Sequence, residues 1–134
     1  MDYQKILKTW AASTVWAALV FIGHAIPGDM VQKADPFFFK HFDKIVHFSM
    51  FFGLCFLLSR SFSANAKARI MNAVGIAASI SFSYALVLET MQSTWFRKRS
   101  SDPLDLAADL AGIIIAAIIS FRRISKIRSA QTTI

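Results

Sequence analysis

Four long apolar runs, none interrupted by proline, constrain this chain more than any other feature of its sequence. They cover approximately residues 10–26, 45–62, 70–88 and 104–121. Each run is close to the ~20 residues that an α-helix needs to cross the hydrocarbon core of a bilayer. The runs lack the wide polar stripe of a surface helix. The sequence therefore predicts an all-α integral membrane bundle of four helices, in a single domain covering residues 1–134.

The composition agrees with a membrane protein. Hydrophobic residues make up 55% of the chain and charged residues 17%, whereas a soluble domain of this size has a large surface to cover with polar groups. Each run contains one glycine (Gly23, Gly53, Gly75 and Gly112), and small residues let membrane helices approach each other closely. Cys55 is the single cysteine, so an intramolecular disulfide is excluded.

The basic residues predict the orientation of the helices. Of the 15 Lys and Arg residues, nine fall on the side of the two termini and six on the opposite side. Because cytoplasmic loops carry an excess of Lys and Arg, both termini are expected in the cytoplasm, as in a multi-pass protein of the inner membrane. The basic residues alternate with apolar runs instead of forming one solvent-facing surface, so nucleic acid is not an expected partner.

The polar chemistry gathers on the predicted outer side, at the ends of three spans. The set comprises Asp43, Lys44 and His47 at the start of the second span, Glu89 and Gln92 at the end of the third, Asp105 and Asp109 at the start of the fourth, and Arg99 in the loop between the last two. Asp105, Asp109 and Gly112 share one helix face, being spaced i, i+4 and i+7. Asp109 lies two turns into its span, where an isolated charge costs about 2.5–3.5 kcal/mol.

Helix capping explains some of these acids without any function. Asp102 precedes Pro103, as an N-cap precedes proline at the first helical position, and Asp105 then falls where the helix dipole stabilises a carboxylate. Asp43 is a further possible cap. The preceding residues 28–42 are predicted to form an outer loop, whose aromatic and basic residues suit the headgroup zone along the membrane surface.

The deeper polar residues have a structural interpretation of their own. Polar side chains tie membrane helices together. A hydrogen-bonded clasp would join Lys44 or Arg99 to Glu89 and Asp109.

These residues resemble the VanZ-like family, named after a protein of glycopeptide-resistance clusters linked to teicoplanin resistance. The first span ends at Pro27, the second opens Asp-Lys-x-x-His-Phe (43–48), and the third ends Glu-x-x-Gln (89–92) before Arg99. The family opens its fourth span Asp-x-x-x-Asn-x-x-Gly, and this chain departs from that pattern with aspartate at Asp109. The resemblance implies a multi-spanning envelope protein, sometimes associated with antibiotic resistance, but implies no biochemical mechanism.

Three functions remain open from the sequence. In the first, the outer site binds a lipid headgroup, an envelope precursor or a glycopeptide-type ligand. In the second, the protein is a hydrolase or transferase acting on a lipid-linked substrate, with His47 as acid or base and Glu89 or Asp109 orienting it. A set of His, Glu and Asp also suits a divalent metal, although no metal or cofactor motif is present. The third function is a small transporter working as an oligomer.

Overall fold

The structure, a computed structural model, describes residues 3–25, 36–64, 69–94 and 103–132. These residues form four α-helices, and no strand occurs among them. The helices are α1 (Tyr3–Ala25), α3 (Pro36–Ser63), α4 (Ile70–Thr94) and α5 (Pro103–Thr132). Each helix contains a segment long and apolar enough to cross a membrane, at Ile6–Ala25, Phe42–Ser63, Ile70–Gln92 and Pro103–Ala130. The predicted all-α membrane bundle is confirmed.

The start of α3 corrects the prediction for residues 36–42. The sequence placed them in a loop, whereas the helix begins at Pro36 and continues without a break into the span. Proline is favoured at a first helical position because its missing N–H would lack a partner there in any case. Asp43 therefore lies inside α3 and cannot cap its N-terminus. The predicted helix start at Pro103 is confirmed, and Asp102 lies outside the described residues.

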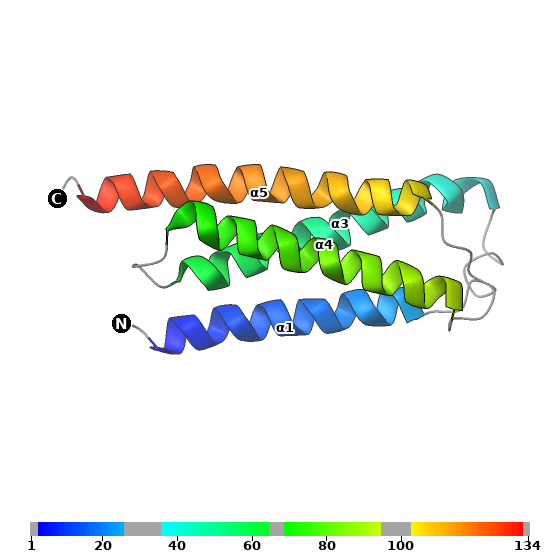
Figure 1. Ribbon diagram of the computed structural model, residues 1–134, viewed down its shortest axis with the longest axis horizontal. Helices are drawn as coiled ribbons and strands as arrows, with labels where there is room; N and C mark the ends of the chain where they lie inside the picture. Colours follow the sequence, from blue (N-terminus) through cyan, green and yellow to red (C-terminus); the bar gives the residue numbers. More distant parts are fainter. Residues whose placement is uncertain (1–2, 26–35, 65–68, 95–102, 133–134) are drawn as a thin grey trace.

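The four helices run antiparallel to their neighbours in the chain, so both termini lie at one end of the bundle (Figure 1). We call this end the terminal end. We call the opposite end, where α1 and α4 finish and α3 and α5 begin, the site end. Helix α3 packs against all three other helices, and α1 and α5 lie on opposite sides of it. The central position of α3 makes it the scaffold to which residues from the other helices are brought.

The interior is apolar and the surface of the bundle is apolar as well. Phe51, Leu54, Leu88 and Val20 are among the largest fully buried side chains. Large hydrophobic residues on all four helices are nevertheless exposed, including Ile22, Ile45, Ile80 and Ile114. A soluble protein rarely exposes so much apolar surface, whereas lipid tails solvate it without cost.

Glycine allows close packing at two of the four predicted positions. A Cβ added to Gly112 of α5 would collide with the Phe48 carbonyl oxygen on α3, and one added to Gly53 would lie 2.6 Å from the indole of Trp16. At Gly23 the obstacle is only the flexible end of Met50. At Gly75 no atom lies within 4 Å, so the prediction that this glycine serves helix packing is wrong.

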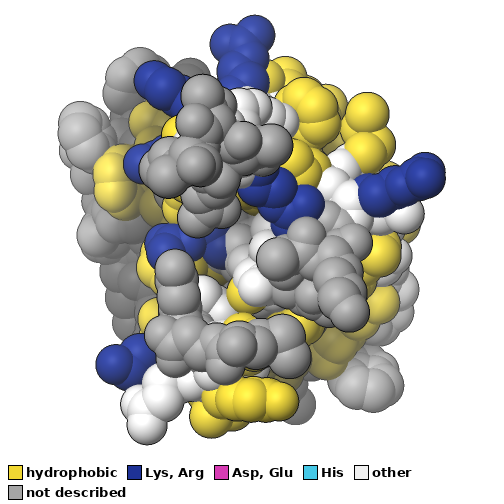
Figure 2. Space-filling model, turned by 90° about the vertical axis from the view of Figure 1, so that its left-hand side faces the viewer, with side chains coloured by type: hydrophobic (Ala, Val, Ile, Leu, Met, Phe, Trp, Pro, Cys, Tyr) yellow, Lys and Arg dark blue, Asp and Glu magenta, His cyan; other side chains and the backbone are white. Residues whose placement is uncertain are grey.

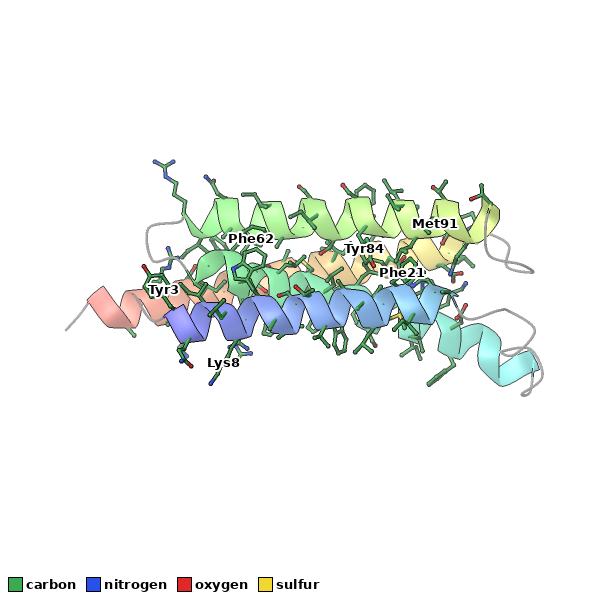
Figure 3. The ribbon with its side chains drawn as sticks, turned by 90° about the horizontal axis from the view of Figure 1, so that it is seen from below. Tyr3, Lys8, Phe21, Phe62, Tyr84 and Met91 are labelled. Atoms are coloured by element: carbon green, nitrogen blue, oxygen red, sulfur yellow. The ribbon has the colours of Figure 1, made fainter. Side chains whose placement is uncertain are left out.

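Hydrogen bonds attach α1 to the rest of the bundle. Trp16 Nε1 donates to the Met50 carbonyl at 2.9 Å, and the Tyr84 hydroxyl donates to the Ala17 carbonyl at 3.0 Å. The hydroxyls of Ser13 and Ser61 are 2.9 Å apart. Figure 3 shows α1 from Tyr3 and Lys8 near the terminal end to Phe21 near the site end.

The terminal end is basic. Viewed directly, its described surface shows Lys and Arg side chains and no Asp, Glu or His side chain (Figure 2). At this end the structure describes the basic side chains of Lys8, Arg60, Arg69, Arg122, Arg123, Lys126 and Arg128. This distribution agrees with the charge asymmetry read from the sequence. The side of the membrane that this end faces stays a prediction.

Candidate functional site

Within the described residues, every buried histidine and acidic side chain lies at the site end. The set comprises His24, His47, Asp105 and Asp109, to which the buried amide of Gln92 is added. The buried polar residues outside this set are serines. Because burying an ionisable group in an apolar bundle is costly unless it is paired, their concentration at one end marks that end as the candidate site.

Helix α5 contributes two carboxylates from one face. Asp105 and Asp109 are one turn apart and both buried, and Gly112 follows on the same face, as the spacing predicted. The absence of a side chain at Gly112 lets the α5 backbone lie against Phe48 and Phe52 of α3. Because the two helices lie so close together here, Asp109, which is 1% exposed, lies next to the polar residues of α3.

Helix α3 pairs with both carboxylates. Lys44 Nζ forms an ion pair with Asp105 Oδ1. His47 Nδ1 lies 3.0 Å from Asp109 Oδ1, and both side chains are almost fully buried. These two links tie α3 to α5. The predicted clasp joined Lys44 or Arg99 to Glu89 and Asp109, and the pairing of Lys44 with Asp105 was not part of that prediction. Asp43 contributes a third, half-buried carboxyl group on the same turn of α3.

Helix α1 supplies a histidine that the sequence reasoning left out of the site. His24 is 2% exposed, and its ring meets that of His47 edge to face, with centroids 4.8 Å apart. The predicted set contained His47 as its histidine, and the structure places His24 beside it. The available signal was a polar residue inside the last turn of an apolar run, at the same end as the other polar residues.

Helix α4 closes the site with Glu89 and Gln92. Gln92 is 2% exposed and its Nε2 donates a long hydrogen bond, 3.4 Å, to the His24 carbonyl. Both carboxylate oxygens of Glu89 are buried. All four helices thus bring at least one predicted or newly found polar residue to this end. Arg99 lies outside the described residues.

Two groups of side chains at this end have the composition of a metal site. His24, His47 and Asp109 form one group, and Asp43, His47 and Asp105 form the other. In each group one potential ligand atom per residue lies within 4.8 Å of the others. Imidazole and carboxylate ligands are those that several divalent metals prefer. The buried His47–Asp109 pair is in addition an arrangement in which a carboxylate orients an imidazole for proton transfer.

Comparison with known proteins gives a family and no closer relative. The family model described as VanZ/LLP1 matches residues 3–125 of the 134 residues. The match spans all four helices up to the last turns of α5, and it includes every candidate site residue. No match was found among curated proteins or among solved structures.

Proposed function

The chain belongs to the VanZ/LLP1 family, and we propose that its site end binds the polar part of an amphipathic ligand that resides in the membrane. A lipid headgroup, a lipid-linked envelope precursor and a glycopeptide carrying an acyl chain share this chemistry. Each combines an apolar chain with hydroxyl or amine groups. The protein would hold the apolar chain against its outer helix faces and the polar part against the buried carboxylates.

The charge of the site end carries this proposal. Its described part holds four carboxyl groups, from Asp43, Glu89, Asp105 and Asp109. Two lysines lie in this part of α3: Lys44, which already pairs with Asp105, and Lys40 one turn earlier in the helix. An excess of carboxylates at the edge of an apolar bundle favours a ligand that brings positive charge or hydrogen-bond donors. An ammonium-bearing headgroup meets this requirement better than a purely anionic one.

The surroundings of the site suit an acyl chain. Phe42 and Ile45 are exposed on the first turns of the α3 span, and Leu104 is exposed at the start of α5. These side chains flank Lys44 and Asp105 in the sequence. A ligand anchored by its headgroup would therefore find apolar side chains next to the carboxylates, at the depth where its own chain begins.

Lipid titration followed by native mass spectrometry tests the proposal. The purified protein is titrated with phosphatidylethanolamine, with phosphatidylglycerol and with free ethanolamine. We expect the first to bind in preference to the other two, and we expect Glu89→Gln and Asp105→Asn to reduce that preference. Arg69→Gln, an exposed charge change at the terminal end, serves as the control. Equal binding of the two lipids, unchanged by both variants, would contradict the proposal.

A role in antibiotic resistance follows as part of the same proposal. A lipophilic glycopeptide would occupy the site in place of a lipid. Cells that produce the protein are then expected to tolerate more teicoplanin than cells producing Glu89→Ala at equal membrane abundance. If cells that produce either chain tolerate the same concentration of teicoplanin, the antibiotic is excluded as a ligand and the lipid headgroup is retained as the proposed one.

An enzyme acting on a lipid-linked substrate is the second candidate, favoured by the His47–Asp109 pair. The Asp109 carboxylate accepts a hydrogen bond from His47 Nδ1 at 3.0 Å, which leaves Nε2 as the nitrogen that can accept a proton from substrate or water. Turnover of a lipid-linked substrate that is lost in His47→Asn, with lipid binding retained, would support catalysis. Retained turnover in that variant would exclude His47 as the acid or base.

A further inference from the structure

Three helices contribute one potential metal ligand each at the site end: His24 from α1, His47 from α3 and Asp109 from α5. We infer that these residues hold a divalent transition-metal ion with the coordination preferences of Zn²⁺. All three side chains are buried, and one potential ligand atom from each lies within 4.8 Å of the other two. The inference stands apart from the proposed ligand, because it is tested with the metal alone.

His24 is oriented as metal-binding histidines are. Its Nδ1 lies 2.8 Å from the Val20 carbonyl oxygen. A carbonyl oxygen only accepts, so Nδ1 carries the proton, and in the neutral ring the lone pair is on Nε2. A ligating histidine commonly donates its other N–H to a backbone carbonyl in this way, which fixes both the tautomer and the ring orientation. Val20 thus prepares His24 Nε2 to face a cation.

A carboxylate oxygen of Asp109 supports the metal site independently of the distances within the group. Its Oδ1 pairs with His47, whereas its Oδ2 is buried and receives no hydrogen bond from the residues that the structure describes. A buried carboxylate oxygen without a partner costs free energy comparable to the desolvation of that group. A metal ion bonded to Oδ2 would remove this cost, and a hydroxyl or amide of the described chain does not do so.

The distances require only a small contraction. Zn–N bonds of about 2.0–2.1 Å place two ligand atoms of a tetrahedral ion about 3.4 Å apart. The upper limit of 4.8 Å within the group exceeds this value by little more than an ångström. Rotation about the side-chain bonds of Asp109 and His47 covers such a difference, so the helices keep their places. Three protein ligands leave a fourth position for water or for an oxygen of a bound molecule.

The neighbouring group of Asp43, His47 and Asp105 is the weaker site for such an ion. Asp105 already pairs with Lys44, and Asp43 is half-exposed. The group offers one imidazole and two carboxylates, a set better suited to harder cations. Because both groups include His47, a substitution at this residue cannot distinguish them. Substitutions at Asp109 and at Asp105 show which of the two groups binds the ion.

Metal titration of the full-length protein tests the inference. The protein is purified in detergent, stripped with a chelator and titrated with Zn²⁺ by calorimetry and with Co²⁺ by visible absorption, which reports four-coordination. We expect one ion per chain. His24→Asn keeps a donor for the Val20 carbonyl and removes Nε2, and Asp109→Asn removes the charge but keeps the shape. Each of these variants is expected to weaken metal binding at least tenfold.

Controls separate a lost ligand from a damaged fold. Arg69→Gln, an exposed charge change at the terminal end, is expected to bind Zn²⁺ as the unchanged chain does, and Asp105→Asn is expected to weaken binding less than Asp109→Asn. Helical content and gel-filtration behaviour are compared for all variants without metal, and a ligand variant counts only if both are preserved. The inference is overturned if the unchanged chain binds no stoichiometric Zn²⁺, or if folded His24→Asn and Asp109→Asn bind it with unchanged affinity.

Discussion

His47 and Asp109 form a buried contact between α3 and α5, with His47 Nδ1 3.0 Å from Asp109 Oδ1. The contact lies one turn deeper than the ion pair of Lys44 with Asp105. The two links form a ladder along the seam where Gly112 lets the helices touch. The seam is therefore both a structural joint and the inner wall of the candidate site, and the two roles make separate predictions.

The His47–Asp109 pair is expected to show energetic coupling. Interhelical hydrogen bonds in membrane proteins contribute about 0.6 kcal/mol on average and up to about 1.7 kcal/mol. The full burial of this pair favours the upper part of that range. The coupling is measured as a double-mutant cycle of His47→Ala and Asp109→Ala on unfolding in detergent micelles, in chelator-treated protein. Strictly additive losses would mean that the two side chains do not interact.

Removing one partner of the Lys44–Asp105 pair is expected to lower the stability of the protein more than replacing both partners with apolar residues. Lys44→Met leaves the buried Asp105 carboxylate without its cation and is expected to cost about 1–3 kcal/mol. Lys44→Met combined with Asp105→Leu removes both charges and is expected to regain most of that loss, since apolar residues can replace a buried ion pair. Thermal stability by gel filtration after heating measures both. A double variant less stable than Lys44→Met would refute the argument.

Part of this site could be predicted from the sequence because it depends on spacing within single helices. The shared face of Asp105, Asp109 and Gly112 follows from helix periodicity alone, and the structure confirms it. The sequence signal for His24, a polar residue in the last turn of an apolar run, does not predict its contact with His47, because that contact depends on how α1 is rotated against α3. Rotation also explains Gly75, which occupies an open face of α4.

The start of α3 at Pro36 was missed for another reason. Aromatic residues next to basic ones are typical of both an interfacial loop and the first turns of a membrane helix. The pairing of the buried polar residues was missed because it depends on distances between helices. The predicted clasp joined Lys44 or Arg99 to Glu89 and Asp109. The structure pairs Lys44 with Asp105 instead of Asp109 on α5, and Arg99 lies outside the described residues.

Substitution of glycine is expected to separate the packed positions from the open one. Gly112→Ala places a methyl group against the Phe48 carbonyl, which cannot move without shifting α3, so a loss of about 1–3 kcal/mol is expected. Gly75→Ala meets no atom and is expected to be neutral or stabilising by up to about 1 kcal/mol, because alanine favours helices. Melting temperatures in one detergent compare them. Equal effects would show that α3 and α5 do not touch at Gly112.

The attachment of α1 is expected to depend on two hydrogen bonds to backbone carbonyls. Trp16→Phe and Tyr84→Phe each remove one donor while keeping an aromatic ring, at a cost of about 0.5–1.5 kcal/mol. Together they are expected to increase hydrogen exchange in α1 more than in α5, which α1 does not contact. Hydrogen exchange with mass spectrometry resolves the two helices. A uniform increase along the chain would indicate general destabilisation instead.

The predicted orientation is testable because the chain has a single, buried cysteine, Cys55. In a Cys55→Ala background, a cysteine replaces Tyr3, which is exposed at the terminal end, or Thr94, which is exposed at the site end. The excess of Lys and Arg at the terminal end places that end in the cytoplasm. The cells are kept intact at the inner membrane, after any outer membrane has been removed, and a membrane-impermeant maleimide is added. We expect the maleimide to label Thr94→Cys but not Tyr3→Cys. Labelling of Tyr3→Cys alone would show the opposite orientation. The carboxylates of the candidate site would then face the cytoplasm and bind ligands from that side.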